Sequence, residues 1–422
     1  MFVKETVKGM RDVLPREMEV RDTLLTEMKR IYRSYGYNLI ETPVMERIEN
    51  MTNNSGGENE KLIFKVLKRG EKLAESDTGD PDSLVDSALR YDLTVPLARY
   101  FAGNAGKLPL PFKSLQIGSV FRADRPQKGR FRQFTQCDID ILGDKSPSAE
   151  IELILATSDF LDSAGISGRT VVISDRRILR AMAEKCGFDE ADFSTVFIIL
   201  DKFDKIGADG VKLELTDSGF PSASVESYIK LLGETAAASD KLSFLESELA
   251  GTIAADAIAN LRYIIDSASD ISGGNVNIRF DPTLVRGMSY YTGTIFEIVS
   301  DDFKGSSIAG GGRYDNMIGS FTGTPTPACG FSIGFERIIA SIMEKANTSP
   351  SDTDKRCVLF SSKLVSDDIL SLQKKCRVLR ADGKTILVLQ MNKNVDFQIK
   401  NLIAEGFQVI TKVNGKEDIL KL

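Results

Sequence analysis

Histidine is absent from all 422 residues of the sequence. The chain therefore lacks the side chain that most often serves as a general base and as a metal ligand. Mechanisms built on a Ser-His-Asp or Cys-His arrangement are excluded. Any catalysis depends on Arg, Lys, Asp, Glu or Tyr side chains, on groups of the substrate, or on a bound metal.

Cysteine is scarce, and its positions are far apart with no CxxC pair. An odd number of scattered cysteines argues against a disulfide framework and against a zinc site. We therefore expect a reducing, cytoplasmic compartment and no metal site built from protein side chains alone. The five positions are Cys137, Cys186, Cys329, Cys357 and Cys376.

Long apolar runs are missing as well, because no stretch approaches 18 apolar residues. We expect neither a signal peptide nor a membrane span. Hydrophobic residues make up 42% of the chain and charged residues 27%, which is typical of a soluble globular protein. The length indicates two or three domains.

An overall positive charge is also lacking, since the net charge is −6. Residues 356–422 differ from the rest, with 12 Lys+Arg against 7 Asp+Glu. A basic tail on an acidic body can contact phosphates. The alternative is a solvated surface on which charge is unevenly spread.

Apolar periodicity and turn residues predict the elements of the first half. The polar stretch 71–86 is predicted to be a loop. Strands at 114–124 and 130–141, joined by a basic tip, are predicted to form a long antiparallel hairpin. The other predicted elements are a helix at 17–35 that ends at Gly36, a strand at 38–46 broken by Pro43, a helix at 149–164, a strand at 170–174 and a helix at 176–186.

The second half contains a helical stretch and a separate terminal unit. Residues 189–269 are predicted to be mostly helical, and a polar linker at 347–354 precedes a small α/β domain. Between them we expect strands at 276–280 and 290–299, a glycine-rich stretch at 309–312 and a helix at 331–346. The terminal unit alternates strands at 357–360, 385–389 and 408–410 with helices at 367–379 and 395–405.

The hairpin carries the most informative side chains. Arginine can clamp phosphate oxygens, Phe134 can stack on a base, and Gln136 and Asp140 can read a polar substrate group. The alternative is a solvent-facing hairpin with scattered charges. Strand alternation puts Arg122 and Asp124 on one face of the first strand, and Arg130, Arg132, Phe134, Gln136, Asp138 and Asp140 on one face of the second.

Three further segments contain candidate residues. Arg286 precedes a strand edged by Tyr290 and Tyr291, although this segment also fits a charged turn before an ordinary strand. The glycines at 310–312 permit a close backbone approach to a ligand, although such stretches are often simple turns. Arg337 lies in the first turns of a predicted helix, where the alternative is a surface arginine.

Together these segments resemble the signature motifs of class II aminoacyl-tRNA synthetases in their histidyl version, in family order from about residue 8 to 345. Residues 36–46 resemble motif 1, with Pro43 at its dimer-interface position. Motif 2 is matched by 121–140, motif 3 by 334–337, the two histidine-specific motifs by 284–291 and 310–315, the amino-group loop by 89–94, and the family's opening by 8–15.

The resemblance implies an α+β fold, with the antiparallel sheet of class II synthetases flanked by helices. It divides the chain into a catalytic domain in two parts (1–186 and 273–346), a helical insertion (187–272) and a shortened anticodon-binding-like α/β domain (355–422). It further implies a homodimer that activates histidine with ATP and Mg²⁺ to form histidyl-adenylate, and then transfers the histidyl group to tRNA(His).

The resemblance also implies a role for each site residue. Arg122 and Arg337 hold the α- and γ-phosphates, and Arg286 is the catalytic cation beside the histidine. Asp124, Arg130 and Phe134 position ATP, with Phe134 under the adenine. The remaining residues bind histidine: Asp92 and Thr94 take its α-amino group, and Gln136, Asp140, Tyr290, Tyr291 and Tyr314 surround the histidine.

Two departures from the family pattern stand out. Ser289 occupies a position where the family usually has Asp. The terminal unit also lacks the counterpart of the family's last strand and helix.

Two other functions remain open from the sequence. One is a non-catalytic paralogue that acts as the regulatory subunit of ATP phosphoribosyltransferase in histidine biosynthesis. The retention of Arg122, Arg286 and Arg337 argues for the enzyme instead. The other is a tRNA-sensing pseudo-synthetase module.

Overall fold

The chain forms two units in the computed structural model, Met1–Ser341 and Ile342–Leu422. The structure describes residues 2–52, 59–126, 130–252, 254–286, 290–303, 306–346 and 355–422. Ser289 and the predicted linker at 347–354 lie outside these ranges. No helix within them is both long enough and apolar enough to cross a membrane.

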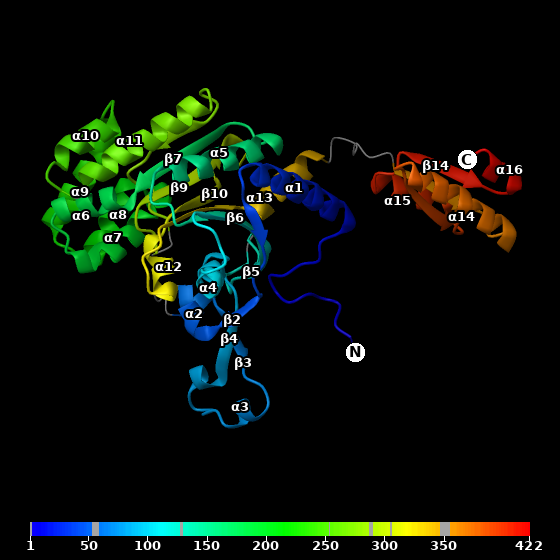
Figure 1. The fold of residues 1–422 in the computed structure, drawn as a ribbon, viewed down its shortest axis with the longest axis horizontal. Helices are drawn as coiled ribbons and strands as arrows, with labels where there is room; N and C mark the ends of the chain where they lie inside the picture. Colours follow the sequence, from blue (N-terminus) through cyan, green and yellow to red (C-terminus); the bar gives the residue numbers. More distant parts are fainter. Residues whose placement is uncertain are drawn as a thin grey trace. The chain divides into compact units, whose positions relative to one another are not determined.

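An eight-stranded sheet forms the centre of the first unit (Figure 1). Strands β1 and β5 are parallel, as are β7 and β8, and every other neighbouring pair is antiparallel. The predicted hairpin is confirmed, since β5 and β6 pair along their whole length, but its strands stop short of the predicted tip, at Phe121 and Gln133 rather than at residues 124 and 130. In sheet order the strands are β1 (Asn38–Ile40), β5 (Phe112–Phe121), β6 (Gln133–Leu142), β11 (Ala328–Ile333), β10 (Ser307–Arg313), β9 (Thr294–Ser300), β7 (Arg169–Asp175) and β8 (Asn277–Phe280).

Helices cover one face of this sheet. Helix α5 (Ser148–Ser163) packs on β6 and β11, and α1 (Pro15–Ser34) packs on α5. Helix α11 (Ala254–Ile271) contacts α5, β7 and β8. The predicted end of the first helix is confirmed, because Gly36 adopts a φ of +86° just beyond α1.

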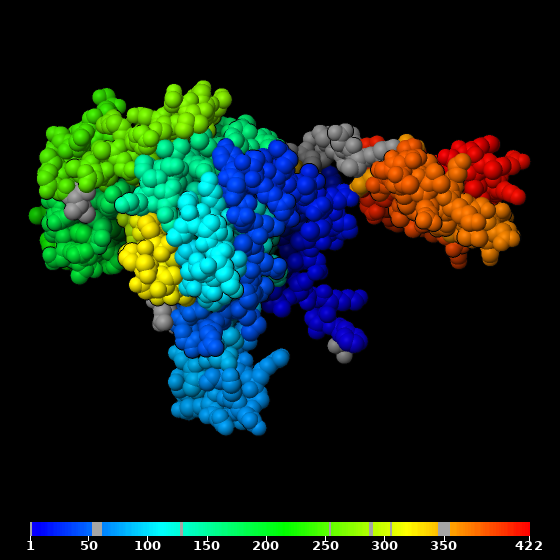
Figure 2. Space-filling model, viewed as in Figure 1, coloured from blue at the N-terminus to red at the C-terminus, as the bar shows by residue number. Residues whose placement is uncertain are grey.

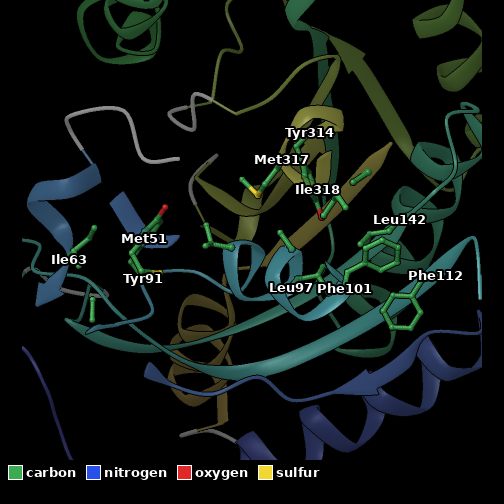
Figure 3. Close-up of a cluster of buried hydrophobic side chains, with 14 residues drawn as sticks. Met51, Ile63, Tyr91, Leu97, Phe101, Phe112, Leu142, Tyr314, Met317 and Ile318 are labelled. Atoms are coloured by element: carbon green, nitrogen blue, oxygen red, sulfur yellow. The ribbon is translucent and has the colours of Figure 1, made fainter. Parts of the chain in front are cut away.

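An apolar cluster joins α4 (Thr94–Asn104) to α12 (Asp315–Thr322) at one end of the sheet. Figure 3 shows Phe101 of α4 and Ile318 of α12 among its side chains. Phe112 and Leu142, from the ends of β5 and β6, belong to the same cluster. Packing in this cluster fixes Thr94 at the start of α4 and Tyr314 just before α12. Both residues lie at the site described below.

A small antiparallel sheet projects from the body of the first unit (Figures 1 and 2). Its order is β2 (Met45–Arg47), β4 (Val85–Leu89) and β3 (Phe64–Leu67), with α2 (Ile48–Thr52) beside β2. The prediction of a loop at 71–86 was incomplete. That stretch contains the short helix α3 (Glu71–Ala74) and a 3-10 helix (Pro81–Leu84), whose first turn is capped by the Asp80 carboxylate.

Residues 176–271 are helical almost throughout, as the sequence predicted for 189–269. Buried apolar side chains such as Leu200, Tyr228 and Leu261 form the interior of this part. The helices are α6 (Arg176–Lys185), α7 (Phe193–Leu200), α8 (Phe203–Asp217), α9 (Ser222–Ala237), α10 (Lys241–Glu248) and α11.

Two sequence predictions around the glycine-rich stretch were wrong. Residues 331–333 belong to β11 rather than to a helix, and α13 (Phe335–Ala346) begins only after Gly334. Because β11 lies between β6 and β10, its residues are almost all buried, and the resulting apolar run resembles a buried helix. The strand expected from Tyr290 also begins later, at Thr294.

The second unit is a three-stranded parallel sheet with helices, which confirms the predicted small α/β domain, although its last helix, α16, was not predicted. Val358 and Cys357 point into separate apolar clusters, as expected for neighbouring residues of a central strand. In chain order the elements are β12 (Lys355–Phe360), α14 (Ser366–Ala381), β13 (Thr385–Gln390), α15 (Val395–Ala404), β14 (Val409–Val413) and α16 (Lys416–Leu420), with β12 in the middle of the sheet.

A buried ion pair fastens β10 to α5. Arg313 donates from Nε and Nη2 to the two oxygens of Glu150, at 2.7 and 2.6 Å. Glu150 is fully buried and Arg313 nearly so. Arg313→Met should lower the free energy of unfolding by about 3–5 kcal/mol, because Glu150 would remain as a buried charge without its partner.

Urea unfolding of the full chain measures this loss. The control is Arg262→Met, which removes the half-exposed pair with Asp240 and should cost less than about 1 kcal/mol. Equal, small losses in both variants would show that the buried pair does not hold β10 against α5.

Candidate active site

A large cavity in the first unit has a volume of about 1120 Å³. Its floor is formed by β6, β10 and β11, and its rim by the start of α4, the connection from α7 to α8 and the start of α13. The structure brings every predicted site residue to its wall: Asp92, Thr94, Arg122, Asp124, Arg130, Phe134, Gln136, Asp140, Arg286, Tyr290, Tyr291, Tyr314 and Arg337.

The alternating face of β6 was predicted correctly from Phe134 to Asp140. These side chains line the cavity, whereas Cys137 and Ile139 on the other face are fully buried. Arg132 was expected on the cavity face, but it precedes β6 and leaves that face. Its Nε donates to the Asp124 carbonyl at 3.1 Å, and its backbone N–H donates to the Gly9 carbonyl at 2.8 Å.

One end of the cavity is acidic. Asp92, Asp138 and Asp140 are each at most 4% exposed. Burial raises the pKa of Asp92 to about 6 and that of Asp138 to about 7, and it holds the pKa of Asp140 well above its usual range. Asp92 Oδ2 and Asp140 Oδ2 are buried and accept no hydrogen bond from the residues that the structure describes. This end is therefore suited to a ligand that donates hydrogen bonds and carries positive charge.

Three tyrosines close the acidic end. Tyr314 donates its hydroxyl hydrogen to Asp140 Oδ1 at 2.6 Å. Its ring packs edge-on against that of Tyr290, with the ring centres 5.9 Å apart. The ring centres of Tyr290 and Tyr291 are 4.9 Å apart. The rings form an aromatic wall beside two buried carboxylates, which suits a planar polar group.

The other end of the cavity is basic. Arg122 donates from Nε to the Tyr91 carbonyl at 3.0 Å, and its guanidinium lies 5.2 Å from the centre of the Phe134 ring. Arg130 pairs with Asp124 at 3.5 Å. The Arg337 guanidinium donates to the Ser307 carbonyl, and burial together with the charges of Arg130 and Arg286 lowers its pKa. Several fixed guanidinium groups therefore face one space, an arrangement that binds phosphates.

Arg286 is held in an unusual backbone conformation. Its φ is +64°, the one positive value of a non-glycine residue in the described ranges. Nη1 donates to Glu297 Oε2 at 3.1 Å. The guanidinium also fills the space above Gly310, where a Cβ atom would lie 2.5 Å from it. The glycine noticed in the sequence thus makes room for a side chain of the site itself.

Sequence reasoning missed several supporting residues. Glu297 fixes Arg286, and Ser332 donates to Asp138 Oδ1 at 2.5 Å. Glu336 accepts the Thr135 backbone N–H at 3.2 Å and pairs with Arg21 of α1. The alternation of β6 signalled Asp138, but no local pattern could signal the others, because their partners come from distant strands and helices.

The comparisons with known proteins agree with one another. The family model described as histidyl-tRNA synthetase matches residues 9–338. A histidine–tRNA ligase of Leifsonia xyli subsp. xyli is 42% identical over 416 residues, which span 97% of this chain and 95% of that protein. One from Aeropyrum pernix is 35% identical over 415 residues, spanning 97% and 90% of the two chains.

Two solved structures are similar along nearly the whole chain. The crystal structure of histidyl-tRNA synthetase from Nostoc sp. PCC 7120 gives a TM-score of 0.79 at 25% identity, covering 99% of this chain and 93% of that one. The crystal structure of an ATP phosphoribosyltransferase regulatory subunit/histidyl-tRNA synthetase from Bacillus halodurans C gives a TM-score of 0.78 at 23% identity. It covers 98% of this chain and 99% of that one. The second similarity shows the fold alone.

The buried carboxylates make stability depend on pH. Each pKa lies above the unfolded value of about 3.9, so protonation stabilises the fold. That contribution is lost as the pH rises through the folded pKa, about 7 for Asp138. Asp138→Asn removes one such group. We expect the variant to have a higher free energy of unfolding than the wild type. This difference should be larger at pH 8 than at pH 5, by on the order of 2 kcal/mol.

Urea unfolding at the two pH values measures this difference. Glu27 and Asp240 have pKa values lowered to about 2, so both stay ionised throughout the range and do not contribute. A gain that is the same at both pH values would mean that Asp138 is not protonated in this interval.

Proposed function

This chain belongs to the histidyl-tRNA synthetase family, and we propose on that premise that its cavity activates histidine with ATP and transfers the histidyl group to tRNA(His). The observation that carries the proposal is the division of one cavity into an acidic, aromatic end and an arginine-rich end. Histidine offers an ammonium group and an imidazole to the first, and ATP offers phosphates to the second.

The acidic end accounts for recognition of histidine. Asp92, Thr94 and Gln136 take the α-ammonium group, and Asp92 Oδ2 is a free acceptor for it within the described residues. Asp140 and Tyr314 form the hydrogen-bonded pair that receives the imidazole, with Tyr290 and Tyr291 along its plane. A site built from buried hydrogen-bonding groups rejects apolar analogues strongly, because they leave those groups unsatisfied.

The arginine end accounts for ATP. Arg122 binds the α-phosphate and Arg337 the γ-phosphate, while Asp124 and Arg130 position the nucleotide. The Arg122–Phe134 pair provides a flat surface on which adenine stacks. Mg²⁺ usually binds through one or two carboxylates together with phosphate oxygens. Asp124 and Glu297 are carboxylates that pair with arginines of this end, and they would hold the ion, which would shield phosphate charge.

The reaction follows from these positions. A carboxylate oxygen of histidine forms a bond to the α-phosphorus of ATP. The bond from that phosphorus to the oxygen bridging the α- and β-phosphates breaks, and pyrophosphate leaves. Negative charge grows on the phosphate oxygens, and the fixed guanidinium groups of Arg122 and Arg286 stabilise it without reorganising. In transfer, the tRNA hydroxyl oxygen forms a bond to the histidyl carbonyl carbon, the bond from that carbon to the phosphate oxygen breaks, and AMP leaves. A phosphate oxygen of the adenylate takes the hydroxyl proton, since the protein has no histidine to serve as the base.

The alternative of a regulatory subunit is less well supported. Relatives that are 35–42% identical over 97% of the chain are named histidine–tRNA ligase. Arg122, Arg286 and Arg337, which a non-catalytic paralogue has no need to keep, all line the cavity.

We further propose a homodimer formed through the segment around Pro43. Arg90 holds this segment by donating to the Thr42 and Pro43 carbonyls at 2.7 and 3.4 Å. Leu39, Val44 and Met45 are each more than 40% exposed, and β1 is an edge strand of the large sheet. Covering these apolar side chains and the open strand edge favours association of two copies.

The remaining parts have supporting roles in this proposal. Residues 1–186 and 273–346 form the catalytic domain, and 187–272 form a helical insertion. The basic residues 355–422 act as a shortened anticodon-binding domain that adds affinity for tRNA through phosphate contacts. The protein works in the cytoplasm, where its tRNA substrate is charged.

Histidine-dependent exchange of pyrophosphate into ATP tests the function directly. We expect rapid exchange with histidine and little with the other amino acids, because only histidine satisfies both Asp92 and the Asp140–Tyr314 pair. Histidine binding without any exchange would instead support the regulatory subunit.

Arg286→Ala should slow adenylate formation by about 10²–10³-fold, the usual loss for one fixed charge-stabilising donor. Histidine affinity should change much less, because Arg286 acts on charge that develops during the reaction. Gly310→Ala should slow the same step by displacing the Arg286 guanidinium. Single-turnover kinetics measure the rate.

The control is Arg30→Ala, which removes an exposed arginine of α1 that pairs with Glu27. It should leave the rate unchanged. If Arg286→Ala behaved like this control, Arg286 would have no part in the chemistry.

A further inference from the structure

Asp138 is a buried carboxylate with no role in the reaction described above. It is 4% exposed and lies on β6 between Gln136 and Asp140. In the neighbouring strand β11, Ser332 is its direct partner in the register. A buried acidic side chain is costly unless it is hydrogen-bonded, so its contacts indicate what it does.

Asp138, Gln136 and Ser332 form a closed ring of hydrogen bonds. Gln136 Nε2 donates to Asp138 Oδ2 at 3.1 Å and to Ser332 Oγ at 3.2 Å. Ser332 Oγ in turn donates to Asp138 Oδ1 at 2.5 Å. Both hydrogens of the Gln136 amide are therefore used within the ring.

The ring fixes which way the amide points. Asp138 Oδ2 accepts from Gln136 Nε2 and Asp138 Oδ1 accepts from Ser332 Oγ, so the NH₂ group of Gln136 faces Asp138. Gln136 Oε1 then points away from the ring, where it is buried without a hydrogen-bond partner among the described residues. Gln136, Asp138, Ser332 and Asp92 all line the same cavity. The free oxygen is thus an acceptor offered to a ligand at the acidic end.

We propose that Asp138, together with Ser332, is a positioning residue that holds the Gln136 amide so that Oε1 accepts a hydrogen bond from the α-ammonium group of histidine. The inference rests on the proposed function. A flipped amide would direct its NH₂ group at the ammonium, replacing an attraction with a repulsion. Asp138 acts through Gln136 and touches neither substrate.

The test is histidine binding to the full-length protein, measured by calorimetry without ATP. Asp138→Asn can accept or donate at this position, so the Gln136 amide is no longer held in one orientation. Histidine affinity should fall by about 10–100-fold, the range for losing one hydrogen bond to a charged group. The rate of adenylate formation at saturating histidine should change less than about threefold. Binding of imidazole-4-propionate, which lacks the amino group, should not change.

A double-mutant cycle separates positioning from general structural damage. In a Gln136→Ala background, Asp138→Asn should cause no further loss of histidine affinity, because the side chain that it orients is gone. An additional loss in that background, or an equal loss of imidazole-4-propionate binding, would overturn the proposal.

Two further measurements keep the outcomes distinct. Ser332→Ala gives a second cycle that leaves Asp138 in place, with a smaller expected loss of about 2–5-fold, since Asp138 still holds one amide hydrogen. If the wild type does not bind histidine, the proposed function is wrong. If it binds and Asp138→Asn binds equally well, only the positioning role is wrong.

Discussion

The close approach of β10 to its neighbours on both sides is the constraint on which the cavity depends. A Cβ atom on Gly311 would overlap the Gly330 carbonyl, and one on Gly312 would lie 2.6 Å from the Thr294 carbonyl. Gly310 leaves room for Arg286, and Gly330 leaves room for Asp140. With side chains at these positions, β10 could not pack against its neighbouring strands. The Arg286 guanidinium and the Asp140 carboxylate would also have no room beside the cavity floor. Glycine thus places a guanidinium and a carboxylate against the same floor.

The two ends of the cavity carry opposite charges, and burying these charges costs folding free energy. The acidic end contains three buried carboxylates whose pKa values are raised, which shows that the fold disfavours their ionised forms. At the basic end, Arg286 is held by an ion pair and a left-handed backbone. Asp92 Oδ2 and Asp140 Oδ2, which have no hydrogen-bond partner among the described residues, are available to a substrate, so the burial that lowers stability also prepares the site for binding.

The elements that depended on local pattern were predictable. The β5–β6 hairpin follows from alternation, α1 from apolar spacing and Gly36, and the terminal α/β unit from its alternation of strands and helices. The prediction failed at β11, where burial on both faces removed the alternation that identifies a strand. Arg132 also departed from its expected face, because β6 begins at Gln133, three residues later than predicted, and the arginine side chain donates to the Asp124 carbonyl instead.

The sequence by itself determined the residue types of the site. The absence of histidine excluded whole classes of mechanism, and motif order identified the arginines, tyrosines and carboxylates that line the cavity. The tertiary structure alone decided which of these groups are paired. The pairing of Ser332 with Asp138 depends on the register of two strands, and that of Arg286 with Glu297 on the left-handed backbone conformation of Arg286. Such contacts join residues distant in sequence, and their geometry exists only once the sheet has closed.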